Sequence, residues 1–169
     1  GTWKFFSTTG SVISEGDFQN DQKQGEWKYY FEKYLDESFQ PLPYSGQLYL
    51  KENYVNGKLN GRTERTAYLN LIPVMCDTSI GTVNPLDTCF QLQYRKVHEV
   101  TYHKNGALHG PFEWRDADGK LVQKGEFRND ERYGAWTQIQ PDPLVTTRSY
   151  RVEANFSDGK LNGRFEKYD

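Results

Sequence analysis

Three histidines lie close together in the second half of the chain: His98, His103 and His109, with Glu99 next to the first. Imidazole and carboxylate groups bind zinc when three or four of them converge. On an extended strand, however, His98 and His103 are five residues apart and face opposite sides. His103 also stands where an aromatic ring recurs along the chain. The sequence therefore favours structural histidines over a metal site, and no metal is predicted.

Acidic side chains gather where turns are expected, and an Asp in a turn hydrogen-bonds its own backbone without any catalytic role. They are Asp21, Asp116, Asp118, Asp130 and Asp158. The chain has no Gly-x-Ser-x-Gly sequence for a serine nucleophile and no glycine loop with the spacing that cradles phosphate. We therefore predict no catalytic residue and no cofactor.

The chain has two cysteines, Cys76 and Cys89, in one Pro- and Asn-containing stretch. A disulfide between them would close a loop of about 14 residues and stabilise the fold by roughly 3 kcal/mol. That reading indicates a secreted, periplasmic or envelope protein. The alternative is a pair of free thiols in a cytoplasmic protein, and a catalytic thiol is the least favoured reading.

A glycine followed by an aromatic strand recurs through the chain, most clearly in the segment Gly-Glu-Trp-Lys-Tyr-Tyr that begins at Gly25. The motif glycines stand at 1, 25, 61, 110, 134 and 163, and the shortest spacing is 24 residues. A period of this size is typical of a repeat array. Such a thin array also explains a composition rich in aromatic residues (15%) and poor in aliphatic ones.

Each repeat contains two runs that alternate as strands do. The second run ends in an aromatic residue or His103, and a turn pair follows two residues later. These pairs are Asn20-Asp21, Asn56-Gly57, Asn105-Gly106, Asn129-Asp130 and Asp158-Gly159. Asn, Asp and Gly all tolerate the positive φ that a tight hairpin requires. Small residues two positions before the aromatic one, such as Gly16, Gly125 and Ala154, leave room for a neighbouring ring.

These patterns predict an all-β fold: one domain over residues 1–169, an elongated, antiparallel, single-layer sheet of β-hairpin repeats with about eleven strands. In the third unit, Thr63 and Arg65 replace the expected rings. Insertions at about 35–47, 69–94 and 141–149 contain prolines and are expected to be loops on one edge of the sheet.

The recurring pattern Gly-x-Trp-x-x-Tyr…Glu-Gly-x-Phe-x-Asn-Asp/Gly-x-x-x-Gly resembles the MORN repeat. The variant to which it is most similar occurs in bacterial proteins described as antitoxins of toxin–antitoxin systems. The segments that carry the resemblance are Gly25–Tyr30, Glu15–Asn20, Tyr54–Gly61, Asn105–Phe112, Gly125–Asn129 with Gly134–Trp136, and Asp158–Phe165. The resemblance implies stacked β-hairpins and a role as a scaffold, a protein-binding platform or a lipid-binding module.

Aromatic residues outside the repeat register are the candidates for ligand contact. They are Tyr34, Phe39, Tyr44 and Tyr49 near the first insertion, and Phe90 and Tyr94 near the second. The alternative for each is local packing.

We therefore expect a non-catalytic protein-binding or scaffolding module that could neutralise a toxin partner. The alternative is an envelope or surface module that binds lipid or glycan through exposed rings. A net charge of −2 with dispersed Lys and Arg argues against sequence-independent nucleic-acid binding, and no apolar run approaches the roughly 18 residues of a membrane span. The chain begins inside a repeat, as a processed fragment would. Its first strand, Trp3-Lys4-Phe5-Phe6, is expected to be covered in the full protein or by self-association.

Overall fold

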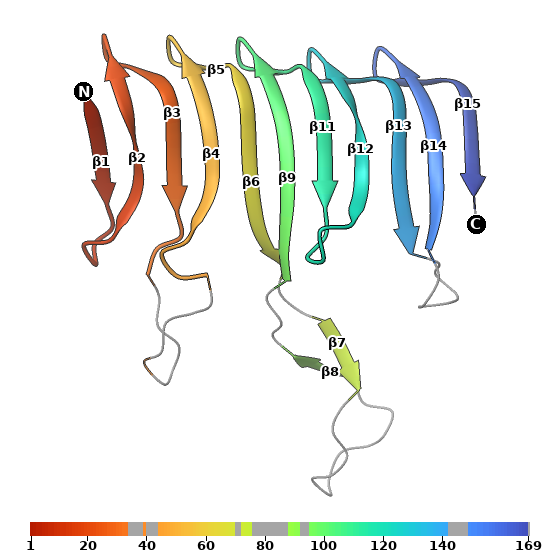
Figure 1. Ribbon diagram of the computed structural model, residues 1–169, viewed down its shortest axis with the longest axis horizontal. Helices are drawn as coiled ribbons and strands as arrows, with labels where there is room; N and C mark the ends of the chain where they lie inside the picture. The colour runs from red at the N-terminus through yellow and green to blue at the C-terminus, as the bar shows by residue number, and fades with distance from the viewer. Residues whose placement is uncertain are drawn as a thin grey trace, which may run out of the picture.

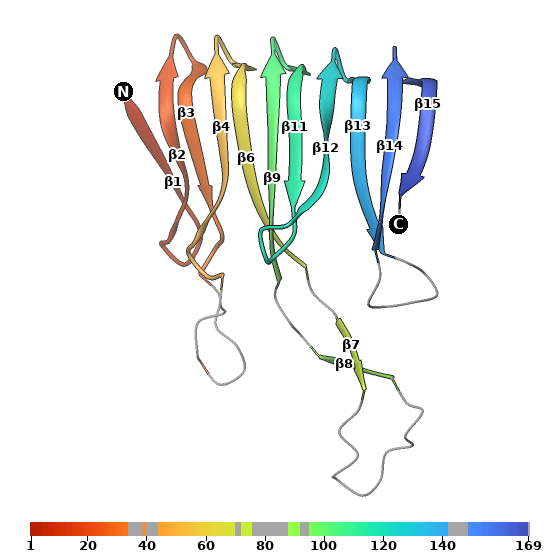
Figure 2. The same ribbon diagram turned by 45° about the vertical axis from the view of Figure 1, so that its right-hand side comes forward.

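The computed structural model describes residues 1–33, 39, 44–69, 72–75, 88–91, 95–141 and 149–168. The described chain is all β, and its main sheet is a single antiparallel layer with the termini at opposite ends (Figures 1 and 2). The predicted fold is confirmed. None of the described residues forms a helix that is long and apolar enough to cross a membrane.

Eleven strands follow one another across the main sheet in chain order, as the repeat predicts. They are β1 (Thr2–Phe6), β2 (Val12–Gln19), β3 (Gln22–Tyr30), β4 (Leu48–Val55), β6 (Gly61–Leu69), β9 (Arg95–Lys104), β11 (Gly110–Arg115), β12 (Leu121–Arg128), β13 (Glu131–Pro141), β14 (Ser149–Ser157) and β15 (Lys160–Tyr168). Two short strands, β5 (Lys58–Leu59) and β10 (Ala107–Leu108), pair with β4 and β9.

The turn pairs act as the sequence predicts. Both residues of every pair have positive φ, from 50° at Asn20, Asn56 and Asp158 to 96° at Gly106. The second residue of the later turns also donates its N–H to the preceding hairpin, as Gly57 does to the Lys23 carbonyl at 3.0 Å and Gly106 does to the Leu59 carbonyl at 2.8 Å. Each of these later turns therefore closes its own hairpin and links it to the preceding one.

The motif glycines are required by backbone shape. Gly25 has φ +69° and Gly134 has φ +66°, and each lies where the register between neighbouring strands shifts. A bulge with a left-handed residue is where glycine costs least. The bulge places the side chain of the tryptophan two residues later over the preceding strand.

Each of these two tryptophans packs on a glycine of the preceding strand. A Cβ added to Gly16 would be 2.3 Å from the Trp27 ring, and one added to Gly125 would be 2.2 Å from the Trp136 ring. The indole N–H groups donate to the carbonyls of Asp17 at 3.2 Å and Glu126 at 3.1 Å. These two tryptophans are buried, so the predicted room for a ring at Gly16 and Gly125 is confirmed.

The third unit has Thr63 at the position where a ring stands in the other units. β6 and β9 pair without a break from Gly61↔His103 to Leu69↔Arg95. Thr63 and Thr101 lie opposite each other in this pair, and both are buried. Continuous backbone pairing here takes the place of the Trp-on-Gly contact seen in the units that begin at Gly25 and Gly134.

The strand ends that flank the three insertions, between β3 and β4, β6 and β9, and β13 and β14, lie at the edge of the sheet opposite the turn pairs (Figure 1), as the sequence predicts for the insertions. The second insertion is not wholly a loop, which corrects the prediction. It contains a separate two-stranded sheet of β7 (Ile72–Met75) and β8 (Thr88–Gln91), in which Pro73 lies opposite Phe90. A strand in a two-stranded ribbon has a free edge, where proline is tolerated.

Candidate functional site

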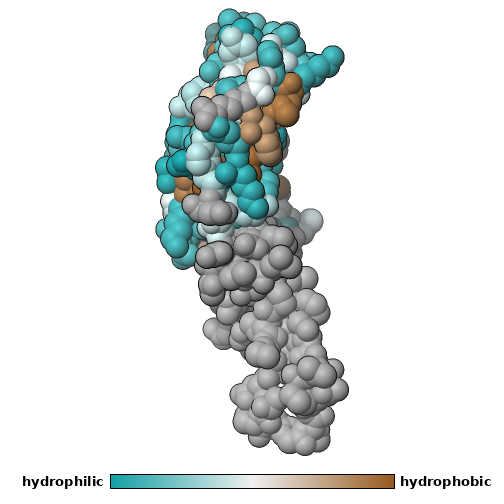
Figure 3. All heavy atoms as spheres, turned by 90° about the vertical axis from the view of Figure 1, so that its right-hand side faces the viewer, coloured by the Kyte–Doolittle hydropathy of each residue, from teal (hydrophilic) through white to brown (hydrophobic). Residues whose placement is uncertain are grey.

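The two faces of the sheet differ in character, because successive side chains on a strand point to opposite faces. We call them the ring face, which carries Trp27 and Trp136, and the polar face, which carries ion pairs such as Lys4–Glu15 at 3.4 Å. Seen from the β15 edge, the larger hydrophobic patch lies to one side and hydrophilic residues dominate the other (Figure 3).

One continuous row of side chains crosses the polar face, with one residue from each of the eleven strands. Every step in it is a direct pair between neighbouring strands. We call it the charged row: Lys4, Glu15, Lys28, Lys51, Glu64, Val100, Glu113, Lys124, Thr137, Glu153 and Glu166. Nine of its members are ionisable, so the row sets the electrostatic pattern of this face.

The row is basic toward one end and acidic toward the other. Lys28 lies directly opposite Lys51, and Glu153 lies directly opposite Glu166. Like charges at directly opposed positions of an antiparallel pair destabilise a sheet. Opposite charges would have been the stabilising choice, so folding alone does not account for these two pairs.

Neighbours on the same strand offset part of this repulsion. Arg151 contacts Glu153 at 3.2 Å, Lys28 contacts Glu26 at 3.4 Å, and the Tyr168 hydroxyl donates to Glu166. Partly exposed ion pairs contribute little to stability, about 0–1 kcal/mol. Most charged members of the row thus have an ion-pair or hydrogen-bond partner, and these contacts offset the like-charge pairing only in part.

Glu15 is held in its ionised form near the basic end. The Tyr30 hydroxyl donates to it at 2.7 Å and Lys4 lies nearby, so the pKa of Glu15 is lowered, chiefly by the Tyr30 hydrogen bond. Burial and the same carboxylate raise the pKa of Tyr30 to about 12. Tyr30 thus stays a hydrogen-bond donor across the physiological pH range.

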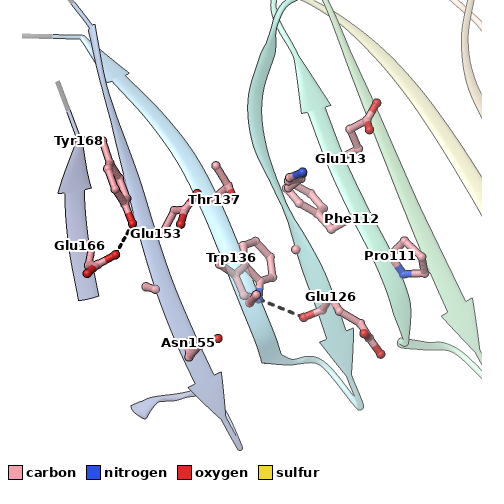
Figure 4. Close-up of a pocket in the computed structure, with 14 residues that line it drawn as sticks. Pro111, Phe112, Glu113, Glu126, Trp136, Thr137, Glu153, Asn155, Glu166 and Tyr168 are labelled. Atoms are coloured by element: carbon pink, nitrogen blue, oxygen red, sulfur yellow. Dashed lines mark hydrogen bonds between the residues drawn. The ribbon is translucent and has the colours of Figure 1, made fainter. Parts of the chain in front are cut away.

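The polar face is hollowed at the acidic end of the row. A groove of about 750 Å³ crosses β11 to β15 there, and its floor includes Glu113, Glu126, Glu153, Glu166 and Tyr168 (Figure 4). One lysine, Lys124, also lines it. The groove runs across the strands, so an extended segment lying in it would meet carboxylates from four of them.

The ring face offers fewer free groups, because its largest rings pack on one another. The Phe127 ring lies 5.0 Å from Trp136, and Phe18 lies 5.0 Å from Trp27, both edge to face. Among the strands of the main sheet, the exposed Trp and Phe rings of the described residues are on the two end strands: Trp3, Phe5 and Phe6 on β1, and Phe165 on β15.

Two of the predicted contact residues pack on a neighbouring ring. Tyr44 and Tyr49 lie 5.1 Å and 4.5 Å from the Phe31 ring, on which both pack. Phe39 is 80% exposed and has a left-handed backbone, with φ +58°. Tyr34 and Tyr94 lie outside the described residues, and Phe90 is described only through its backbone in β8.

The predicted disulfide lies outside the described part of the chain at Cys76, and Cys89 is described only through its backbone opposite Val74. Of the histidines, His98 lines a polar-face hollow near Lys96, whereas His103 contacts the Thr63 hydroxyl at 3.2 Å on the ring face. No metal-binding cluster of His, Cys, Asp or Glu occurs among the described residues.

The charged row is the feature that sequence reasoning missed. Its signal is present in the repeat: the residue three positions after each motif glycine is Lys4, Lys28, Glu64, Glu113, Thr137 or Glu166. The other members lie on the intervening strands. Reading this position down the aligned repeats, rather than the aromatic positions, would have predicted the row.

No protein-family model matches the chain, and no curated protein is similar enough to match it.

Proposed function

We propose that the chain is a non-catalytic protein-binding repeat module of the MORN type, and that it recognises its partner with the charged row. The observation that carries the proposal is the pairing of like charges at Lys28↔Lys51 and Glu153↔Glu166. Such pairs destabilise the free sheet, and the repulsion within each pair falls when a partner brings opposite charges close to it.

The same two like-charge pairs define the charges that the partner must present. The partner carries an acidic segment that lies over Lys28 and Lys51, and a basic segment that lies in the groove over Glu153 and Glu166. Complementary charges steer association and discriminate against wrong partners. Neutralisation of a toxin protein is one concrete form of this role, because inhibition needs only a tight, specific contact.

The test is affinity capture from the source cells, with soluble and membrane fractions kept apart and reductant omitted. The unmodified chain should retain one stoichiometric protein, and K28E/K51E and E153K/E166K should each lose it. The matched control is K58E/K160E, which makes the same charge change as K28E/K51E at two hairpin turns. Equal capture by all four proteins would refute the role of the row.

Exposed rings at the ends of the sheet support a second candidate, the binding of lipid or glycan. Trp3 is 57% exposed and Phe165 is 60% exposed. Cosedimentation with neutral phospholipid vesicles that W3A/F165A abolishes, with no protein captured, would favour this candidate. A secreted or envelope location is compatible with both candidate functions, and it rests on a disulfide between Cys76 and Cys89. If that disulfide forms, thiol titration of the denatured, unreduced protein should find no free thiol.

A further inference from the structure

A second hollow lies on the polar face, in the middle of the sheet and away from both of its end strands. It has a volume of about 480 Å³ and lies over β4, β6, β9 and β11 (Figure 1), with the β11–β12 turn as one wall. We call it the basic hollow, because its lining includes Lys51, Lys96, His98 and Arg115. Each of the four strands has a neighbour on both sides, so the hollow does not depend on a free edge of the sheet.

The strand register brings hydrogen-bond donors together in the basic hollow. His98 lies directly opposite Thr66 of β6 on one side and directly opposite Arg115 of β11 on the other. Lys96 stands two residues before His98 on the same strand, so both side chains point to the polar face. The hollow therefore gathers a hydroxyl, an imidazole, a guanidinium and two ammonium groups from four neighbouring strands.

The acidic side chains of the lining have partners of their own. Glu64 contacts the Arg62 guanidinium. The Asp116 carboxylate accepts two backbone N–H groups of the β11–β12 turn, at 3.0 Å and 2.9 Å. The Arg115 guanidinium is fixed between Glu113 at 2.6 Å and a backbone carbonyl of the same turn at 2.9 Å. These contacts leave the acids less able to neutralise the other cations of the hollow.

Two basic side chains at the centre of the hollow have no such partner. Within the described part of the chain, Lys96 and His98 make no ion pair and no side-chain hydrogen bond. Burial lowers the pKa of His98, and the positive charges of Arg62, Lys96 and Arg115 lower it further. Glu113 acts in the opposite direction but does not offset them. Positive charge therefore exceeds negative charge around this imidazole, and an anion bound among these groups would relieve the repulsion.

We propose that the basic hollow binds a phosphate monoester group. Its donors come from four strands and therefore approach a ligand from different directions. A phosphate group has three terminal oxygens that can accept from them together, and a charge of about −2 near neutral pH. A flat carboxylate has one oxygen fewer and half that charge. The open side of the hollow leaves room for the group that carries the phosphate.

This site is separate from the partner surface proposed above, although Lys51 borders both. Thr66, Lys96 and His98 are not members of the charged row. The K96E variant should therefore retain the protein that K28E/K51E loses. Failure of one proposal leaves the other intact.

The test follows the histidine ring resonances of the full chain by NMR while a phosphate compound is added at constant ionic strength. The probes are inorganic phosphate and acetyl-phosphoserine amide, with acetyl-serine amide as the matched control. The His98 resonance, assigned with H98Q, should move saturably with both phosphates and not with the control. The pKa of His98 should rise in the bound state, because the anion favours the imidazolium. The His103 resonance, on the ring face, should not move.

The two phosphate probes also distinguish the source of the ligand. Equal affinity for both would identify the free anion as sufficient. Binding of the phosphoserine compound that is at least about tenfold tighter would identify a phosphorylated side chain. Either result supports a phosphate site in the basic hollow.

Two substitutions test whether this hollow, rather than general charge, binds the phosphate. Lys96→Glu should weaken binding at least about tenfold, whereas the matched control Lys104→Glu, with the same charge change on the same strand, should not. Thr66→Val removes only the hydroxyl and should weaken binding about threefold. Three results would each overturn the proposal: no saturable movement of His98 at up to about 10 mM of either probe, equal movement of His103, or equal losses in the two lysine variants.

Discussion

Single residues carry unusual weight in this sheet, because a single layer buries few side chains. Trp27, Val97 and Trp136 are the buried apolar residues of the described chain, with Thr63 and Thr101 the buried polar ones. Aromatic rings bury the most area per residue, about 150–250 Å² each. Stability therefore depends on a few ring contacts rather than on a broad aliphatic core.

Replacing Gly125 with alanine should destabilise the fold by about 1–3 kcal/mol. The new Cβ would be 2.2 Å from the Trp136 ring, so the ring must move and lose its bond to the Glu126 carbonyl. Urea unfolding monitored by tryptophan fluorescence measures the change. In a Trp136→Leu background the same alanine should cost much less, and an undiminished cost would show that the ring contact is not the cause.

Acidification below neutral pH should weaken the fold through His98 and His103. Burial lowers the pKa of both histidines in the folded state. The unfolded chain therefore binds protons first, so the contribution is fully present above the ordinary pKa of about 6.5 and is lost as pH falls below it. His103 also contacts the Thr63 hydroxyl, and a protonated imidazole acts only as the donor in this contact.

The measurement is the free energy of unfolding at pH 7.5 and pH 5.5, for the unmodified protein and for H98Q/H103Q. The double variant should lose less stability between the two values of pH. A loss equal to that of the unmodified chain would remove the histidines from the explanation and leave the carboxylates to account for it.

Among the elements, the hairpin turns were predictable and the polar face was not. Asn-Gly and Asn-Asp pairs specify their conformation locally, through positive φ, so five turns, the strand order and the strand directions follow from the sequence. The positions of Gly25 and Gly134 were visible in the repeat, but the bulges at these glycines could not be predicted. A register shift depends on how the neighbouring strand pairs. β7 and β8 were missed because Pro73 is tolerated in a ribbon with free edges.

The contacts of the aromatic candidate residues could not be predicted from the sequence for a related reason. Tyr44 and Tyr49 stand outside the repeat register, yet they pack on Phe31. Whether an irregular ring is free depends on contacts that the repeat period does not encode. The charged row, in contrast, is regular and was overlooked because charged residues on a sheet are usually read as a solvated face.

Two turns with the same pair, Asn-Asp, should respond in opposite ways to glycine. Asp21 has φ +58°, and its side chain makes no hydrogen bond in the described structure, so Asp21→Gly should stabilise by about 0.5 kcal/mol by relieving the left-handed backbone. The Asp130 carboxylate accepts the Leu108 N–H at 2.8 Å, so Asp130→Gly should destabilise by about 1 kcal/mol. Thermal unfolding of both variants checks the pair, and equal shifts would contradict it.

At the scale of the whole molecule, the sheet is a chain of neighbours. The substantial contacts between strands all join sheet neighbours. Hydrogen bonds between successive hairpins recur with the repeat, from Gly57 N–H to the Lys23 carbonyl at 3.0 Å through Gly159 N–H to the Arg132 carbonyl at 3.2 Å. Stability in such an array is a sum of unit and interface terms. The extended charged row is possible because no second layer formed by the described residues covers the polar face.

A substitution in one repeat should therefore destabilise that repeat and its neighbours without affecting distant strands. In Gly125→Ala, amide hydrogen exchange should speed up in β11 to β15, where Trp136 and Phe112 lose their support, and should remain unchanged in β1 to β4. The unbroken pairing of β6 with β9 separates the two halves and should hold the boundary. Exchange mapped by mass spectrometry on peptic fragments measures this directly. Equal acceleration in both halves would mean that the eleven strands unfold as one cooperative unit, and that the nearest-neighbour description of this sheet is wrong.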